Sequence, residues 1–180
     1  MTHDHIRQDI LDWVIGYIEV DHKFYDYKFP PCPYARAARL KGLLDIQVYE
    51  SGSATNFVES NVQQVIDTTY TVRVLVMPPR FKYNWFLKHY MKQLNSRVVA
   101  NDLYCQFGTA LKTHSQYPGL FNQGPYCIVI INKLSDILDG HRALLKTDYY
   151  KPWAQHHYQA VVERRQHTLD NYNKVKNDNS

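Results

Sequence analysis

The sequence has few cysteines and no long apolar run. Its three cysteines are an odd and small number, which does not fit the disulfide framework of small secreted proteins. No hydrophobic stretch approaches the roughly 20 residues needed to cross a bilayer. The first residues also lack the charged and then apolar pattern of a signal peptide. We therefore expect a soluble, cytoplasmic protein with reduced thiols and no membrane contact.

Familiar catalytic motifs are also missing. The chain has no glycine-rich dinucleotide or phosphate loop, no His-Glu-x-x-His, no Cys-x-x-Cys and no Gly-x-Ser-x-Gly. The adjacent His156 and His157 diverge by about 100° on a helix and do not share an ion easily, and His3 and His5 lie near the terminus. The sequence therefore predicts no metal and no cofactor. It argues against several enzyme classes, but not against enzymes in general.

The pattern that is present is an alternation of helical and strand-like segments. With 180 residues, 44% hydrophobic residues and a formal net charge of +4, the chain suits one globular domain. Apolar runs predict strands at 46–49, 69–77, 103–107 and 126–131, and helical periodicity predicts helices at 4–18, 33–42, 56–66, 83–97, 135–145 and 153–169. We expect a single α/β or α+β domain over 1–180, with one sheet of about four strands, helices packed against it and a frayed tail at 170–180.

The most chemically suggestive segment is Pro31-Cys32-Pro33-Tyr34-Ala35-Arg36. If Pro33 is the first helical residue, Cys32 is the N-cap and faces the positive end of the helix dipole. Arg36 follows one turn later on the same face, and Arg39 lies one step further. This arrangement lowers a thiol pKa and predicts that Cys32 is a catalytic thiolate. If Cys32 has no such role, the same geometry predicts a site that binds an anion. The alternative is a small buried residue in a rigid turn, which is also our interpretation of Cys105 and Cys127.

A long irregular segment, 108–125, carries three glycines and two prolines. It contains His114, Tyr117 and Asn122, which can donate, accept or titrate, and long loops on a rigid scaffold often bind ligands. We expect any site for an anionic small molecule to lie where this loop meets the Cys32 helix. The alternative is that the loop covers a sheet edge while Cys32 packs beneath the first helix.

The run around Cys32 resembles the Asn-Leu-Cys-Pro-Phe-Ala motif near the start of an uncharacterised bacterial domain family of unknown function. That family also has a helix before the motif, and later an Asn, a short Tyr/Pro stretch, a strand and a helix. Here Asn122-Gln-Gly-Pro-Tyr126, the strand 127–131 and the helix after Ser135 are similar in order. The sequence departs from the family in having Phe29-Pro30-Pro31 before the cysteine and in lacking the middle His-Pro stretch. The resemblance implies a fold and no activity.

A second, local resemblance is to glutaredoxins and glutathione transferases, in which Cys-Pro-Tyr or Cys-Pro-Phe opens the first helix. In this chain Ala35 stands where a second cysteine would complete a dithiol, so the resemblance implies no dithiol cycle. The segment before Cys32 is a poor strand, and no proline precedes a strand to match that fold's cis-proline. The likeness therefore concerns the cysteine turn alone.

A basic and aromatic stretch runs from residue 80 to residue 92. Its candidate nucleic-acid contacts are Arg80, Lys82, Tyr83, Trp85, Lys88 and Lys92. Cations at i and i+4 form one helical stripe that can follow phosphates while aromatic rings stack on bases. The alternative is an ordinary amphipathic helix with Phe86, Tyr90, Leu94 and Val98 buried and the lysines in water.

Two function classes follow from these features. One is a small enzyme or thiol- and anion-binding protein centred on Cys32. The other is a non-catalytic module that contacts nucleic acid weakly, or a protein partner, through 80–92. The sequence identifies no substrate, reaction or oligomeric state.

Overall fold

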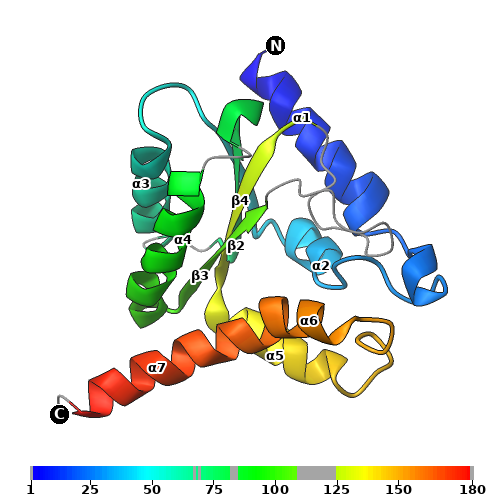
Figure 1. The fold of residues 1–180 in the computed structure, drawn as a ribbon. Coiled ribbons are helices and arrows are strands. Elements are labelled where there is room, and N and C mark those ends of the chain that lie inside the picture. Colours follow the sequence, from blue (N-terminus) through cyan, green and yellow to red (C-terminus); the bar gives the residue numbers. More distant parts are fainter. Residues whose placement is uncertain (1, 67, 69, 82–84, 109–124, 179–180) are drawn as a thin grey trace.

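A computed structural model describes residues 2–66, 68, 70–81, 85–108 and 125–178. Four strands form one mixed sheet in the order β1-β2-β4-β3 (Figure 1). They are β1 (Leu44–Val48), β2 (Val72–Met77), β3 (Leu103–Gly108) and β4 (Cys127–Lys133). The predicted single sheet of about four strands with packed helices is confirmed. Each expected strand is present, although β2 begins three residues later than residue 69.

Pairing in the sheet follows from how the strands are connected. The helix α3 (Ala54–Ile66) carries the chain from β1 to β2, and such a crossover leaves these two strands parallel. β4 is antiparallel to both of its neighbours, with Val74 opposite Ile130 and Cys105 opposite Ile131. The two central strands, β2 and β4, are the most apolar and the most deeply buried, as expected for strands covered on both faces.

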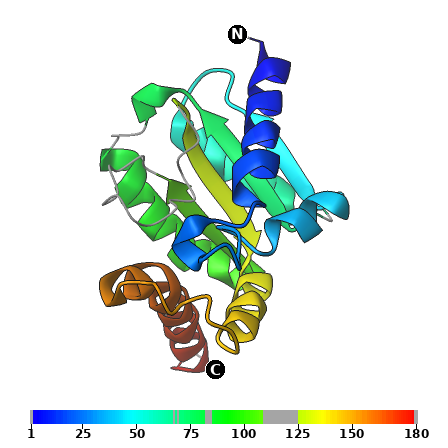
Figure 2. The ribbon, with the colours of Figure 1, turned by 90° about the vertical axis from the view of Figure 1, so that its right-hand side faces the viewer.

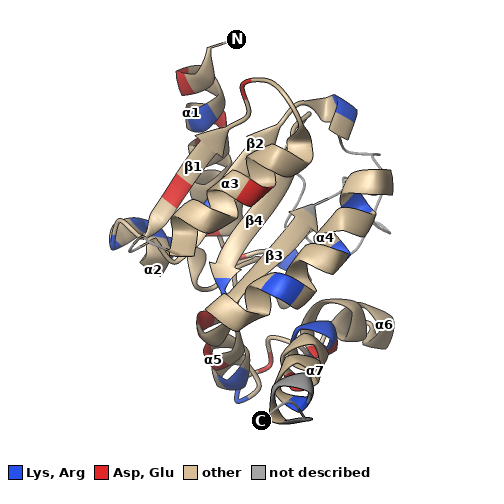
Figure 3. Cartoon of the chain, turned by 90° about the vertical axis from the view of Figure 1, so that its left-hand side faces the viewer, with Lys and Arg blue, Asp and Glu red and all other residues tan. Residues whose placement is uncertain are grey.

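One face of the sheet is covered by α3 and by α4 (Trp85–Val98), which Figure 3 shows lying across it. The buried side of α4 consists of Leu87, Met91, Leu94 and Val98. The expectation that Phe86 shares this side is wrong, whereas Tyr90 packs against it and is partly buried. The pair Phe86 and Tyr90 and the pair Leu87 and Met91 have the same helical spacing. The helix is rotated so that Leu87 and Met91 face the sheet while Phe86 faces outward.

The other face is covered by the N-terminal helices (Figure 2). They are α1 (His3–Trp13), a π-helical continuation η1 (Val14–Ile18), a 3-10 turn η2 (Lys23–Tyr25) and the short α2 (Ala35–Leu40). Ile10 is almost fully buried against Val74 and Ile128 of the central strands. The hydroxyl of Tyr126 donates to Asp9 at 2.7 Å, which joins the start of β4 to α1.

The C-terminal helices pack below the sheet in the view of Figure 1. They are α5 (Leu134–Leu144), α6 (Gln155–Tyr158), the π-helical turn η5 (Gln159–Glu163) and α7 (Arg164–Asp178), and two further 3-10 turns are η3 (Pro79–Phe81) and η4 (Val99–Asn101). α7 continues well beyond the helix end that the sequence indicates near Leu169. The start of α5 is capped from a distance: the Asp102 carboxylate accepts from the Ser135 N–H at 2.8 Å.

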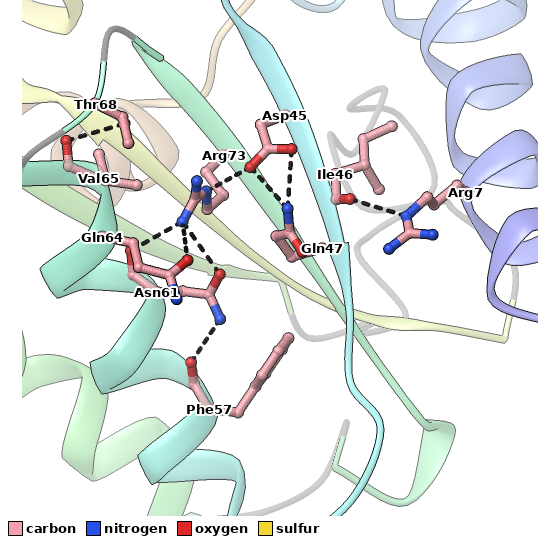
Figure 4. A network of polar contacts seen from close by, with 10 residues as sticks. All are labelled: Arg7, Asp45, Ile46, Gln47, Phe57, Asn61, Gln64, Val65, Thr68 and Arg73. Carbon is pink, nitrogen blue, oxygen red and sulfur yellow. Dashed lines mark hydrogen bonds and ion pairs between the residues drawn. The ribbon is translucent and has the colours of Figure 1, made fainter.

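A buried arginine joins β1, β2 and α3 (Figure 4). Arg73 pairs with Asp45 directly opposite on β1, with 2.7 Å between Nε and Oδ2. Its Nη1 donates to Gln64 at 3.0 Å and to the Asn61 side chain at 3.3 Å, both on α3. A buried guanidinium requires such partners, because an isolated charge is very costly to desolvate.

Candidate functional site

The Cys32 turn differs from the capped helix that the sequence suggests. The N–H of Ala35 donates to the Cys32 carbonyl at 3.2 Å, which closes a turn at Pro33 and Tyr34 before the α-helical bonds begin. α2 therefore starts at Ala35, with Tyr34 as its N-cap, and it has six residues. The prediction that Pro33 opens the helix and Cys32 caps it is wrong. An i+3 turn comes first, and Cys32 is held by its own N–H, which donates to the Ile18 carbonyl at 3.2 Å.

The electrostatic surroundings of the Cys32 thiol also oppose the expected thiolate. Burial of the sulfur raises its pKa, although Cys32 as a residue is partly exposed. Two effects lower this pKa: hydrogen bonding by the N–H groups of Tyr34 and Ala35, and the positive charge of Arg165. Together they are smaller than the effect of burial. The predicted lowering of the pKa is therefore wrong in sign. The start of a helix and an arginine are both present, but desolvation is the larger effect.

One of the two predicted arginines, Arg39, is not available to an anion at the thiol. Arg39 forms a bidentate ion pair with Glu19, with both nitrogen–oxygen distances at 2.7 Å. The Glu19 side chain is 4% exposed, so Arg39 serves to neutralise a buried carboxylate. Arg36 is exposed on α2. The cation that acts on Cys32 is Arg165 of α7, which is distant in sequence and which the local pattern did not indicate.

The loop residues predicted to complete the site lie outside the described residues. His114, Tyr117 and Asn122 fall within 109–124, so their meeting with Cys32 stays a prediction. An open hollow of about 520 Å³ lies between α1 and β1, and Arg39 is on its wall. Cys32 does not line it.

Next to the Cys32 turn, the structure assembles an aromatic cluster that the sequence did not single out as a site. His141 of α5 contacts two tyrosine hydroxyls, Tyr150 from Nδ1 at 3.2 Å and Tyr158 from Nε2 at 3.4 Å. Burial lowers the pKa of His141, and the charges of Arg165 and Arg142 lower it further. Its signal in the sequence is the aromatic run from Lys146 to Trp153, with Tyr149 and Tyr150, which predicts packing between two helices.

The same cluster joins an early segment of the chain to a late one. The Tyr149 hydroxyl donates to the Pro31 carbonyl at 2.6 Å, and its ring stacks on Tyr25 with centroids 4.6 Å apart. Trp153 donates from its indole N–H to the Tyr25 hydroxyl at 3.2 Å. These contacts fix the Cys32 segment against α5 and the chain that follows it. The packing interpretation of the aromatic run therefore fits the structure.

The second candidate surface is at the N-terminal end of α4. Trp85 and Phe86 are 75% and 61% exposed, although they are among the largest apolar side chains of the protein. Lys88 and Lys92 are exposed on the following turns, and the His89 ring stacks on Trp85 with 5.7 Å between centroids. We call these five residues the α4 surface.

The other predicted members of this surface divide into two groups. Arg80 is exposed on η3, with its guanidinium over the Phe81 ring at 4.9 Å. Lys82 and Tyr83 lie outside the described residues. Figure 3 shows basic positions repeated along α4. One of these, Arg97, is neutralised by Glu59 at 3.2 Å, whereas in the described part of the chain no acidic group pairs with Lys88 or Lys92.

Neither a metal centre nor a membrane span is visible in the described residues. No group of three or more His, Cys, Asp or Glu side chains there could hold a metal ion. None of the helices described is both long and apolar enough to cross a bilayer. Comparison of the chain with family models, curated proteins and solved structures finds no match.

Proposed function

We propose that the protein binds single-stranded nucleic acid through the α4 surface. The observation that carries this proposal is the exposure of Trp85 and Phe86 next to two cations without acidic partners in the described structure. Aromatic rings that stack on bases, combined with side chains that contact phosphates, form the usual recognition surface for single strands. Each stacked base contributes about 1–3 kcal/mol, without sequence preference.

The geometry supports this surface better than the Cys32 turn. A catalytic thiol needs a lowered pKa, and burial raises that of Cys32. An anion site there needs a free cation, and Arg39 is committed to Glu19. Trp85 and Phe86, in contrast, are consecutive exposed residues at the start of a helix of 14 residues. A base stacked there would bury apolar surface that the folded chain leaves in water.

Fluorescence anisotropy with a labelled oligo-dT strand and a matched duplex tests the proposal. We expect weak binding of the single strand that is lost between roughly 50 and 200 mM salt. Replacing Lys88 and Lys92 by alanine should weaken binding and reduce the slope of log K against log salt by roughly 1.4, since each phosphate contact contributes about 0.7. Trp85→Ala should weaken binding and leave that slope unchanged.

The matched control is the pair Lys146→Ala and Lys151→Ala, which removes the same charge from two exposed lysines beyond α5. This control should bind like the wild type apart from a small long-range effect. Equal losses in both double variants would mean that net charge and not the α4 surface governs binding. If no oligonucleotide binds at low salt, the proposal is wrong, and the exposed aromatic pair becomes a candidate contact for a protein partner.

A further inference from the structure

The outward backbone groups at the two edges of the sheet differ in whether they have hydrogen-bond partners. At the β3 edge, the Asn95 side chain of α4 donates from Nδ2 to the Cys105 carbonyl at 2.9 Å and accepts from the Cys105 N–H at 2.7 Å. One amide group thus takes the place of a neighbouring strand and satisfies both backbone groups at the centre of that edge. Further strand addition is blocked at this point.

In the described residues, no strand lies against the outer edge of β1. The Leu43 carbonyl accepts from Val72, and the Tyr49 N–H donates to the Val76 carbonyl, so odd-numbered residues of this segment bond to β2. The even-numbered Leu44, Ile46 and Val48 must therefore direct their backbone groups away from the sheet. In the described structure no hydrogen bond reaches their N–H groups, and Arg7 alone touches the Ile46 carbonyl, from Nε at 3.4 Å.

Space for another strand exists beside this edge. The open hollow of about 520 Å³ lies along β1 and is walled by α1. Figure 3 shows β1 at the outer margin of the sheet, and Figure 4 shows Arg7 reaching its outer side from α1. Arg7 is exposed and its bond to the Ile46 carbonyl is long, so displacing it costs little.

The β1 sequence matches itself in the antiparallel direction. Turned about a twofold axis at Ile46, Leu44 meets Val48, Asp45 meets Gln47, and Ile46 meets its own copy. The two apolar pairs fall on the α1 side, and the polar pairs fall on the α3 side. Asp45 already accepts from the Gln47 amide within one strand at 3.0 Å, so the same acceptor and donor are suited to pair across the axis. No like charges meet across the axis within β1.

We propose that β1 pairs with β1 of a second copy of this chain, which gives a twofold dimer with one continuous sheet. A second copy fits this edge because a closed dimer requires a self-complementary patch, which the β1 pattern provides. On the wall of the hollow, Asp4 and Arg7 pair with each other at 3.1 Å within one copy, so this pair brings no uncompensated charge toward a second copy. In this dimer Arg7 competes with the partner strand for the Ile46 carbonyl.

Cross-linking tests the register directly. Opposite residues that exchange both backbone bonds have Cα atoms about 5.5 Å apart, within the range for a disulfide. In a Cys32→Ser background, Ile46→Cys should form a disulfide-linked dimer under mild oxidation. The matched control, Ser60→Cys, places an exposed thiol on α3 and should form no cross-linked dimer, so that it runs at 21.3 kDa on a non-reducing denaturing gel.

Sedimentation velocity over a wide concentration range tests the dimer without a cross-link. We expect Arg7→Ala to dimerise several-fold more tightly than the wild type, because the competitor for the Ile46 carbonyl is gone. Ile46→Pro removes an outward N–H that makes no bond to β2 and should abolish the dimer while its circular dichroism stays native. If Ile46→Pro fails to fold, the Ile46→Cys cross-link and the Arg7→Ala variant still test the dimer. Monomers at every concentration, together with no Ile46→Cys cross-link, would overturn the proposal.

Discussion

The Tyr34 side chain lies directly over Gly140. Its hydroxyl donates to the Gly140 carbonyl at 2.7 Å, and a Cβ at position 140 would come within 2.8 Å of ring atom Cε2. The glycine sits in the middle of α5, where it carries a conformational cost. Its role is to admit the tyrosine of the Cys32 turn, and this contact joins segments that are distant in sequence.

We expect Gly140→Ala to have opposite effects in two backgrounds. In a Tyr34→Ala background the space is empty, so alanine should stabilise the protein by roughly 0.5–1 kcal/mol through its helix propensity. In the wild type the new methyl group displaces the Tyr34 ring, so we expect no gain or a loss. Urea unfolding followed by circular dichroism measures both. Equal gains in the two backgrounds would show that the ring does not press on position 140.

Removing Arg73 should strongly destabilise the fold. Arg73→Leu leaves the Asp45 carboxylate and the acceptors on α3 without their shared donor, and breaking a buried ion pair costs about 3–5 kcal/mol. We expect a loss toward the lower end of that range, because Asp45 keeps 15% exposure. Adding Asp45→Leu should recover part of it. A loss below about 1 kcal/mol in urea unfolding would mean that the pair acts like an exposed one.

The strands could be predicted from the sequence because their signal is local. Apart from Arg73, the run 72–77 is apolar and rich in valine, and such a run suits a strand buried on both faces. The buried face of α4 could not be predicted in the same way, because Phe86 with Tyr90 and Leu87 with Met91 have the same spacing. Periodicity does not choose between two equal stripes, and the choice depends on how the helix packs on β3 and α3.

The Cys32 site shows the limit of local reasoning more clearly. The N–H groups near the sulfur and the need for a cation follow from the nearby sequence. Burial does not, because segments far away in the chain pack against the turn, as Tyr149 does when it donates to the Pro31 carbonyl. Arg165 of α7, whose charge acts on the thiol, is also distant in sequence. The Asp102 cap of α5 is similar: a serine at the start of the expected helix 135–145 predicts a cap by Ser135 itself. In the structure the Ser135 N–H donates to the Asp102 carboxylate, which comes from before β3.

Stability should fall with acidification below the ordinary histidine range, partly because of His141. Its pKa in the folded protein is lowered by burial and by Arg165 and Arg142. The unfolded chain therefore binds more protons near pH 6, and linkage makes unfolding more favourable as the pH falls through the unfolded pKa of about 6.5. The loss stops growing once the pH is below the folded pKa.

Urea unfolding between pH 7 and pH 5 checks this assignment in wild type and His141→Asn. The variant should lose less stability over that interval than the wild type. His22 and His157 also have lowered pKa values, so His141→Asn should retain part of the pH dependence. An unchanged slope in His141→Asn would mean that His141 does not contribute.

Cys32 should be the first of the three thiols to react with limiting iodoacetamide. Cys105 and Cys127 are 2% and 0% exposed inside the sheet, and burial raises the pKa of Cys105 to about 12. Cys32 is partly exposed, but its pKa is also raised, so we expect it to react slowly near neutral pH. Its labelling rate, followed by mass spectrometry, should still be rising above pH 9, because the thiolate fraction grows until the pH passes the raised pKa. A rate that levels off below pH 8 would show that the N–H groups and Arg165 outweigh burial. Earlier labelling of Cys105 or Cys127 would contradict the order of exposure itself.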